Sequence, residues 1–299
     1  MKEEDKTSQT NLPEIDKLWD YSNPKETALK FKELLHDAEK SGNQFYRAEL
    51  LTQLARTQSL QRAFTEAHLI LDSVQKMLST QEMPVPEIRY LLERGRTYNS
   101  NNEQEKAIPL FKAAFEKAVI NNEDFYAIDA LHMLGIADKP QEQLTWNLLA
   151  MELAEKSNNR KATGWLGPLY NNIGWTYHDM QDYSKALVMF EKSLAWRIEH
   201  KDEQGIFIAK WCLGRVNRSL NRIDEALQIQ KQLAKEIEDK NVNPDGYVYE
   251  ELAECLLLQG KIEEAKTYFW LAYELLSKDE WLKANEQNRL ERLLKLGKG

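Results

Sequence analysis

The side chains that most often catalyse reactions or bind metals are dispersed along this 299-residue chain. Metal sites and catalytic sites both need several donor groups at a defined spacing. The sequence contains no paired-histidine spacing, no phosphate-binding glycine motif, no Gly-x-Ser-x-Gly elbow and no Cys-x-x-Cys pair. We therefore expect no enzyme activity, no cofactor and no metal site. The five histidines are His36, His68, His132, His178 and His200.

The two cysteines and the lack of a signal or membrane segment predict a cytoplasmic protein. Cys212 and Cys255 each fall in a predicted helix, which favours reduced, packed thiols over a disulfide or a zinc site. Residues 1–11 are polar and lack the apolar run of a secretory signal, and no apolar stretch has the length of a membrane span. The formal charge of −8 argues against nucleic-acid and membrane partners, and most carboxylates are expected on solvated helix faces.

The composition predicts an all-α fold. Twelve glycines and eight prolines are few for 299 residues, and 42% hydrophobic content is enough for a buried core. The clearest local pattern is residues 171–177 followed by residues 183–193. Two antiparallel helices approach closely where side chains are small, so Gly174 on the first helix and Ala186 on the second are expected to set the crossing. Tyr177, Phe190 and Ser193 would fill the space around them.

This helix pair recurs along the chain at intervals of about forty residues. The small residues of the first helices are Ala55, Gly95, Gly135, Gly174, Gly214 and Ala253. Those of the second helices are Ala28, Ala67, Ala107, Ala186, Ala226 and Ala265, and Asn147 is the exception in this register. Recurrence at a constant period predicts one domain of stacked helix pairs rather than two unrelated domains.

The turn and cap signals give the expected boundaries. Residues 1–11 are interpreted as a disordered tail, Leu12 to Tyr21 as a short amphipathic helix that caps the N-terminal end, and Asn23-Pro24 as the start of a helix that continues to about Lys40. The domain is expected to cover residues 12–299, with helix pairs centred near 44–78, 84–120, 123–157, 163–199, 202–239 and 244–277 and a C-terminal capping helix at 279–296. Pro168 requires its helix either to begin near Leu166 or to be kinked.

The recurring pattern of Gly174, Tyr177, Ala186, Phe190 and Ser193 resembles the tetratricopeptide repeat, although that repeat has a standard length of roughly 34 residues. The resemblance implies a right-handed α-solenoid whose first helices line a concave groove. In that family, the residues six and three before and one and four after the small position form the inner wall. Among the residues at these offsets, the candidate peptide-binding set is Arg56, Arg89, Arg96, His132, Asn171, Trp175, Trp211, Arg215, Arg218 and Tyr247.

Arginine forks beside aromatic rings suit an extended peptide or protein segment with acidic and apolar side chains. A tryptophan at helical spacing is also a common core residue, and an arginine can bridge two helices, so both interpretations stay open. The favoured function is a non-enzymatic interaction scaffold. The alternatives are a peptide-sensing regulator of the bacterial tetratricopeptide type that acts on a protein partner, and a non-catalytic subunit of an enzyme complex. The segment before Ala28 is too short for a DNA-binding helix-turn-helix domain.

Overall fold

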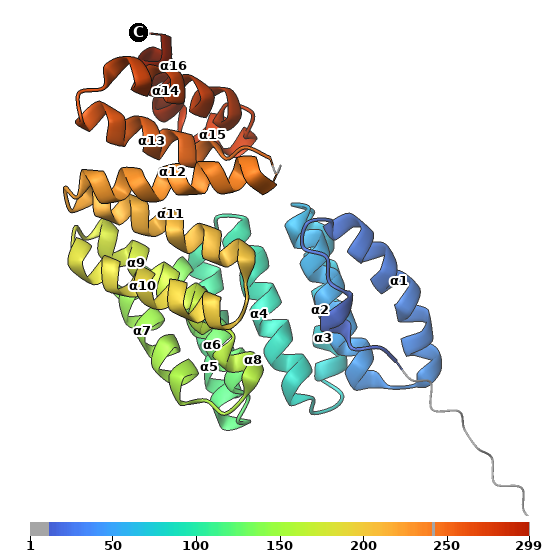
Figure 1. Cartoon of the computed structure of the whole chain (residues 1–299). Coiled ribbons are helices and arrows are strands. Elements are labelled where there is room, and N and C mark those ends of the chain that lie inside the picture. Colours follow the sequence, from blue (N-terminus) through green and yellow to red (C-terminus); the bar gives the residue numbers. More distant parts are fainter. Residues whose placement is uncertain (1–11, 241–242, 299) are drawn as a thin grey trace, which may run out of the picture. The chain divides into compact units, whose positions relative to one another are not determined.

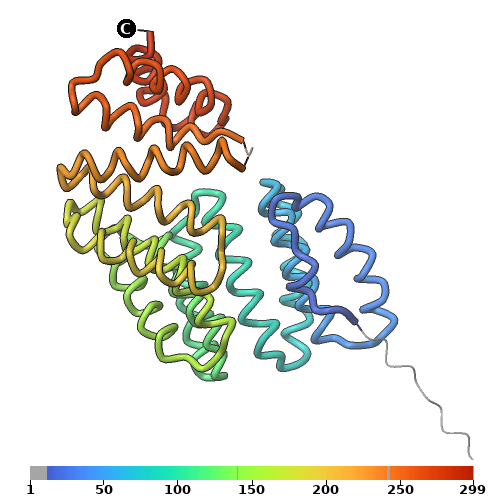
Figure 2. The backbone as a smooth tube through the Cα atoms, viewed as in Figure 1, coloured from blue at the N-terminus to red at the C-terminus, as the bar shows by residue number. Residues whose placement is uncertain are grey.

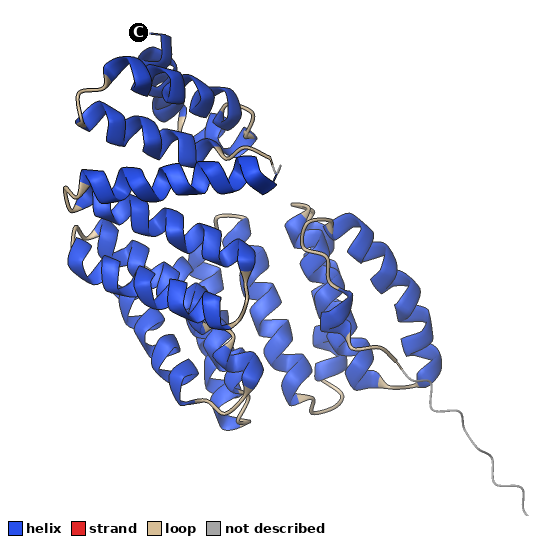
Figure 3. Cartoon of the chain, viewed as in Figure 1, coloured by secondary structure: helices blue, strands red, loops and turns tan. Residues whose placement is uncertain are grey.

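The structure, a computed structural model, describes residues 12–240 and 243–298, and within these ranges it contains helices and turns but no strand (Figures 1 and 3). The predicted tail at residues 1–11 lies outside the described residues. The chain divides into two compact units. Unit 1 ends at Trp165 and unit 2 begins at Leu166.

Unit 1 contains a single 3-10 turn, η1, followed by eight helices within its described residues (Figure 1). These are η1 (Ile15–Leu18), α1 (Pro24–Ser41), α2 (Gln44–Leu60), α3 (Phe64–Leu78), α4 (Pro84–Ser100), α5 (Gln104–Ile120), α6 (Asp124–Ala137), α7 (Pro140–Lys156) and α8 (Arg160–Thr163). Unit 2 contains α9 (Leu166–Asp179), α10 (Tyr183–Glu199), α11 (Glu203–Ser219), α12 (Ile223–Lys240), α13 (Gly246–Leu258), α14 (Ile262–Leu276), α15 (Glu280–Asn285) and α16 (Gln287–Lys298). The all-α repeat architecture predicted from the sequence is confirmed.

Local sequence explains where the helices begin and end. Asn23 caps α1 by accepting a hydrogen bond from the backbone N–H of Glu26, and Gly42 ends the helix with a φ of 69°. Pro168 lies in the first turn of α9, which begins at Leu166. No intrahelical hydrogen bond is lost there, because the first backbone N–H groups of a helix have no partner within it. The second helices α3, α5, α10 and α12 follow tight turns, each of which contains one residue with positive φ. Those residues are Arg62, Asn102, Gln181 and Asn221.

The close approach inside a helix pair is made by a glycine and an aromatic ring. A Cβ atom on Gly174 would lie 2.5 Å from the ring of Phe190, and one on Gly95 would lie 2.5 Å from the ring of Phe111. Both rings are fully buried. Ala186, the partner expected for Gly174, is also buried, but the phenylalanine four residues later fills the space that the glycine leaves.

The register expected for Asn147 is wrong. α7 begins five residues after Gly135, whereas α10 begins nine residues after Gly174. Asn147 is therefore the eighth residue of its helix, as Phe190 is of α10, and a Cβ atom on Gly135 would lie 2.6 Å from its amide. Asn147 thus takes the place of the phenylalanine, and the small-residue position falls on Gln143.

Two terminal segments differ from expectation. Only Ile15–Leu18 of the predicted helix at Leu12 to Tyr21 is helical, as one 3-10 turn, and its apolar side chains pack against α1 and α2. The C-terminal helix expected at 279–296 is broken at Glu286 into α15 and α16. The break lets α16 lie against α14 so closely that a Cβ atom on Gly297 would lie 2.7 Å from the backbone of Trp270.

Each helix pair buries its apolar residues between its two helices and against the next pair within the same unit. One large ring per pair lies at the centre of several of these layers, namely Phe111, Phe190 and Phe269, and Phe31 takes this role in α1. The tube in Figure 2 shows the antiparallel alternation of the helices within each unit. None of the helices in the described ranges has the length and apolar character needed to cross a membrane.

Candidate functional site

A cavity with a volume of about 570 Å³ in unit 1 is lined by residues of the first helices α2, α4 and α6. All four predicted site residues of this unit line it, namely Arg56, Arg89, Arg96 and His132. The cavity is also bordered by Trp165, the last residue of unit 1, and by the segment that precedes α1. The offsets taken from the repeat resemblance therefore lead to one hollow in this unit.

The floor of the cavity is a network of alternating charges. Arg96 on α4 donates one hydrogen bond of 2.8 Å to Glu93 and a second, short one to Asp129 on α6. Both carboxylate side chains are less than a tenth exposed. Burial disfavours the charged guanidinium, but the carboxylates of Asp129 and Glu93 outweigh it and raise the pKa of Arg96 above its usual value. The positive charge of Arg96 is therefore already balanced by two carboxylates of the protein.

Arg56 differs from Arg96 because its guanidinium has spare donors. Its one ion pair among the described residues joins its Nε to Oε2 of Glu93 at 3.7 Å, and no described residue accepts a hydrogen bond from it. Burial lowers the pKa of Arg56, and the attraction to Glu93 only partly opposes this shift. Oε2 of Glu93 is itself buried without a hydrogen-bond partner among the described residues. A carboxylate entering the cavity would meet an incompletely paired cation at Arg56.

Arg89 lies at one edge of the cavity and holds three partners at once. Its guanidinium donates to Asp16 at 2.7 Å, to the hydroxyl of Tyr126 at 3.2 Å and to Glu49 at 3.4 Å. Burial raises the pKa of Tyr126 to about 12, so its hydroxyl stays protonated at pH 7. Burial also raises the pKa of Glu49, against the attraction of Arg89. Lys161 adds a second cation beside Asp16, at 3.4 Å.

Aromatic rings form the side of the cavity that α6 provides. Phe125 and Tyr126 are in edge contact with ring centroids 5.2 Å apart, and Trp165 lies 6.1 Å from Phe125 and 4.9 Å from His132. Burial lowers the pKa of His132, so the imidazole is neutral at pH 7 and adds to the aromatic surface. Sequence reasoning missed Phe125 and Tyr126 because the inner-wall offsets skip them, and it missed Trp165 because that residue lies in the connection between repeats.

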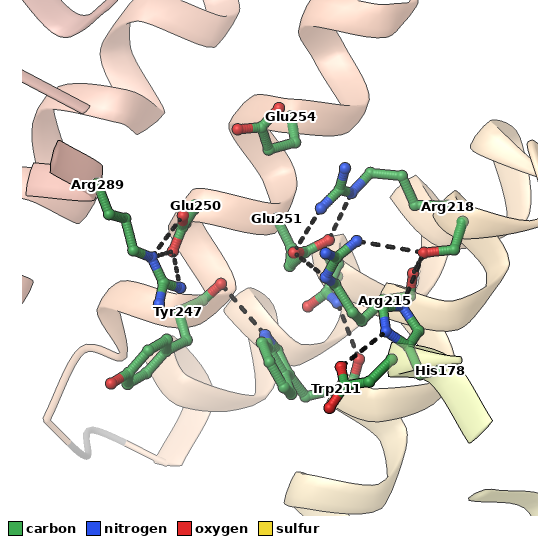
Figure 4. A network of polar contacts seen from close by, with 12 residues as sticks. His178, Trp211, Arg215, Arg218, Tyr247, Glu250, Glu251, Glu254 and Arg289 are labelled. Carbon is green, nitrogen blue, oxygen red and sulfur yellow. Dashed lines mark hydrogen bonds and ion pairs between the residues drawn. The ribbon is translucent and has the colours of Figure 1, made fainter. Parts of the chain in front are cut away.

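In unit 2, Arg215 and Arg218 on α11 converge on one carboxylate, Glu251 on α13 (Figure 4). Arg218 donates two hydrogen bonds to Glu251, of 2.7 and 2.9 Å, and Nε of Arg215 lies 3.3 Å from it. The side chain of Glu251 is only 5% exposed. Of the two interpretations left open for these arginines, the structure places them in the helix-bridging arrangement.

The aromatic candidates of unit 2 divide between a core contact and a hollow. Trp175 packs against Phe190 with centroids 5.3 Å apart and lies 5.8 Å from Trp211. Trp211 also donates its indole N–H to the backbone carbonyl of Tyr247 at 3.2 Å (Figure 4). These last two residues line a second cavity of about 210 Å³ together with Phe207, Ile208 and Asp245. Asn171 faces a neighbouring helix, where its Oδ1 lies 3.4 Å from Sγ of Cys212.

Comparisons with known proteins identify the fold. A family model described as tetratricopeptide repeat matches residues 167–197. The apo form of RapI shares 13% identity, with a TM-score of 0.70, and the alignment covers 89% of this chain and 76% of RapI. The apo form of the quorum sensor NprR from B. thuringiensis shares 14% identity, with a TM-score of 0.66, and the alignment covers 94% of this chain and 79% of NprR. NprR in complex with its cognate peptide NprX also shares 14% identity, with a TM-score of 0.55, and that alignment covers 94% of this chain and 82% of NprR.

A STAND signal-transduction ATPase with a tetratricopeptide repeat sensor, from Pyrococcus horikoshii, is also similar at 14% identity and a TM-score of 0.69. The alignment covers 89% of this chain and 42% of the ATPase, so the chain spans less than half of that protein. No curated protein sequence matches the chain. Residues 167–197, in α9 and α10, thus match the tetratricopeptide repeat model, and the stacked helix pairs around them have a fold similar to that of these solved structures.

Proposed function

We propose that the chain is a non-enzymatic cytoplasmic scaffold that binds an extended peptide, or a peptide segment of a protein, on the inner wall of unit 1. Folds of this type are generally interaction modules rather than catalysts. One observation carries the proposal: a hollow of about 570 Å³ combines an incompletely paired arginine, Arg56, with a side of aromatic rings. The cytoplasmic location is supported by the two buried free thiols, which suit a reducing compartment.

The residues of the cavity select for a particular ligand chemistry. Arg56 can take a carboxylate with donors that no described residue uses. Phe125 and Trp165 offer apolar faces for an aromatic or aliphatic side chain. A peptide in which an acidic residue neighbours an apolar one would satisfy these groups together.

The inner wall of unit 2 is proposed to contribute less to peptide binding than that of unit 1. Its cavity at Trp211 and Tyr247 suits one apolar side chain. Arg215 and Arg218 are committed to Glu251, and a ligand carboxylate would have to replace a hydrogen-bonded pair that already exists. For these two arginines the structure therefore favours a stabilising role over ligand binding.

A peptide-sensing regulator is the second candidate. It is favoured by the similarity of the fold to RapI and to NprR. The structure of NprR has been solved in complex with its cognate peptide NprX. Such a regulator would use the same cavity and would add a protein partner whose binding depends on the peptide. Measuring a pulled-down partner with and without a cavity peptide distinguishes this function from a constitutive scaffold.

The proposal is tested by selecting peptides from a random phage-displayed library on the full chain and measuring their affinities by fluorescence anisotropy. Selected sequences should contain an acidic residue next to an apolar one. Arg56→Ala should weaken their binding by about tenfold or more, the loss of about 1.4 kcal/mol or more expected for a charge-assisted contact. The matched control is Arg222→Ala, which removes an exposed arginine that lines neither cavity.

The proposal would be wrong if no sequence family were enriched on the chain, or if Arg56→Ala and Arg222→Ala bound the selected peptides with the same affinity. Circular dichroism of both variants must match the parent. This control is expected to succeed, because Arg56 makes one ion pair at 3.7 Å and no hydrogen bond to the described residues.

A further inference from the structure

The chain places one of its own segments on the inner wall of unit 1. Residues 12–21, called here the N-terminal strap, precede α1 and run back along α2 (Figure 2). The backbone carbonyl of Pro13 accepts a hydrogen bond of 2.7 Å from the hydroxyl of Tyr46, and the indole N–H of Trp19 donates one of 3.0 Å to Gln53. Both partners belong to α2, so the strap follows this helix across the wall where ligand binding is proposed.

The strap has a fixed part and an accessible part. Ile15 is 4% exposed and packs into the core with Phe31 and Leu50, which anchors the segment. Asp16, the next residue, points the other way and is 41% exposed as a side chain. The anchor can therefore stay in place while the Asp16 carboxylate exchanges its partners with solvent or with another ligand.

Asp16 lies between two hollows of the same wall. A cavity of about 470 Å³ opens beyond it, towards Tyr46, Glu49 and Val85. This cavity and the larger one have Asp16, Arg89, Tyr126 and Lys161 in common. The Asp16 side chain thus occupies the position at which the two hollows meet.

The partners of Asp16 form an anion position that separate elements assemble. Arg89 of α4 donates to it at 2.7 Å, and Lys161 of α8 lies 3.4 Å away. They are 73 and 145 residues distant in sequence. Burial opposes ionisation, but these two cations lower the pKa of Asp16, so it is charged at pH 7. Among the residues that line the larger cavity, four are cationic and three, including Asp16, are anionic.

We propose that Asp16 is a built-in competitor, whose carboxylate fills the anion position at Arg89 and Lys161 that a carboxylate of the bound peptide takes. The inference rests on the proposed function and extends it, because it assigns a second acid-binding position besides Arg56. A ligand must displace Asp16 from Arg89, so the affinity of the chain for acidic peptides is held below the value that the wall alone would give. The partner is thereby defined as a peptide with a carboxylate side chain close to aromatic residues.

The test uses titration calorimetry with a probe that has one ionisable group, the N-acetylated and C-terminally amidated peptide Gly-Phe-Asp-Phe-Gly, and with its Gly-Phe-Asn-Phe-Gly analogue. Asp16→Asn keeps the shape of the strap residue and removes its charge. It should tighten binding of the Asp probe by about tenfold. This factor is expected if Asp16 occupies the anion position roughly nine-tenths of the time, because only the remaining tenth of the molecules can then bind the probe. The Asn probe should gain nothing, and adding Arg89→Gln to Asp16→Asn should abolish the gain.

Asp20→Asn is the matched control, because Asp20 is on the same strap and bonds Ser22 rather than the wall. It should leave the affinity of the Asp probe at the parent value. Equal affinity of parent and Asp16→Asn for the Asp probe would overturn the inference, as would an equal gain for both probes or for both variants. The two proposals can fail separately. If Asp16→Asn has no effect but library-selected peptides still lose affinity with Arg56→Ala, the role of Asp16 as a competitor is rejected and the proposed peptide binding is retained.

Discussion

Replacing both Arg215 and Arg218 with alanine should destabilise unit 2 rather than leave it intact. The double change removes both cations that pair with Glu251 among the described residues, and the side chain of this carboxylate is 5% exposed. Breaking a buried ion pair from one side costs about 3–5 kcal/mol. The arginines themselves are 28% and 17% exposed, so water can reach the site, and we expect a loss near the lower end, about 3 kcal/mol.

The assay is urea unfolding followed by circular dichroism, with Glu251→Gln as the partner change. Adding Glu251→Gln to the double variant should restore part of the lost free energy of unfolding, because the unpaired charge is gone. Lys156→Ala is the comparison, since its ion pair with Glu152 is largely exposed and its loss should leave the unfolding midpoint at the parent value. A loss below about 1 kcal/mol for the double variant, with no recovery in the triple, would refute the assignment of these arginines to Glu251.

Three further outcomes are expected. Gly174→Leu should lower the free energy of unfolding by about 1–3 kcal/mol or more in urea titration, because even a Cβ atom would lie 2.5 Å from the Phe190 ring; a parent-like midpoint would mean that the helix-pair packing is misassigned. Burial lowers the pKa of His132, so the unfolded chain binds its proton more readily, and stability should fall as pH drops below about 6.5. His132→Gln should reduce that slope, and an unchanged slope would exclude this cause. Burial raises the pKa of the Cys212 thiol to about 12, so it should react with a thiol reagent only on unfolding, and rapid labelling of the native protein would contradict its burial.

Recurrence made the helix pairs predictable. The glycines and alanines repeat because a helix crossing tolerates few side chains, and Phe111 and Phe190 repeat with them because a glycine leaves room for a ring. The same argument failed at Asn147, because α7 begins closer to its glycine than other second helices do, and sequence offsets counted from Gly135 do not reveal a shortened connection.

The site was only partly predictable, and for a different reason. Offsets place Arg56 and Arg96 on an inner wall, but they do not say which carboxylates meet them, because Asp129 lies on the next first helix and Glu93 lies outside the chosen offsets. Asp16 comes from a segment before the first repeat. Contacts made between elements that do not repeat carry no periodic signal in a single sequence.

The account depends most directly on whether the inner wall of unit 1 holds a peptide carboxylate at Arg56. The decisive measurement is the dissociation constant of the strongest library-selected acidic peptide, determined by titration calorimetry on the parent, Arg56→Ala and Arg222→Ala. The account predicts a loss of about tenfold or more in affinity for Arg56→Ala and parent affinity for Arg222→Ala, with equal unfolding midpoints for all three. Parent affinity for Arg56→Ala at an unchanged midpoint would contradict it.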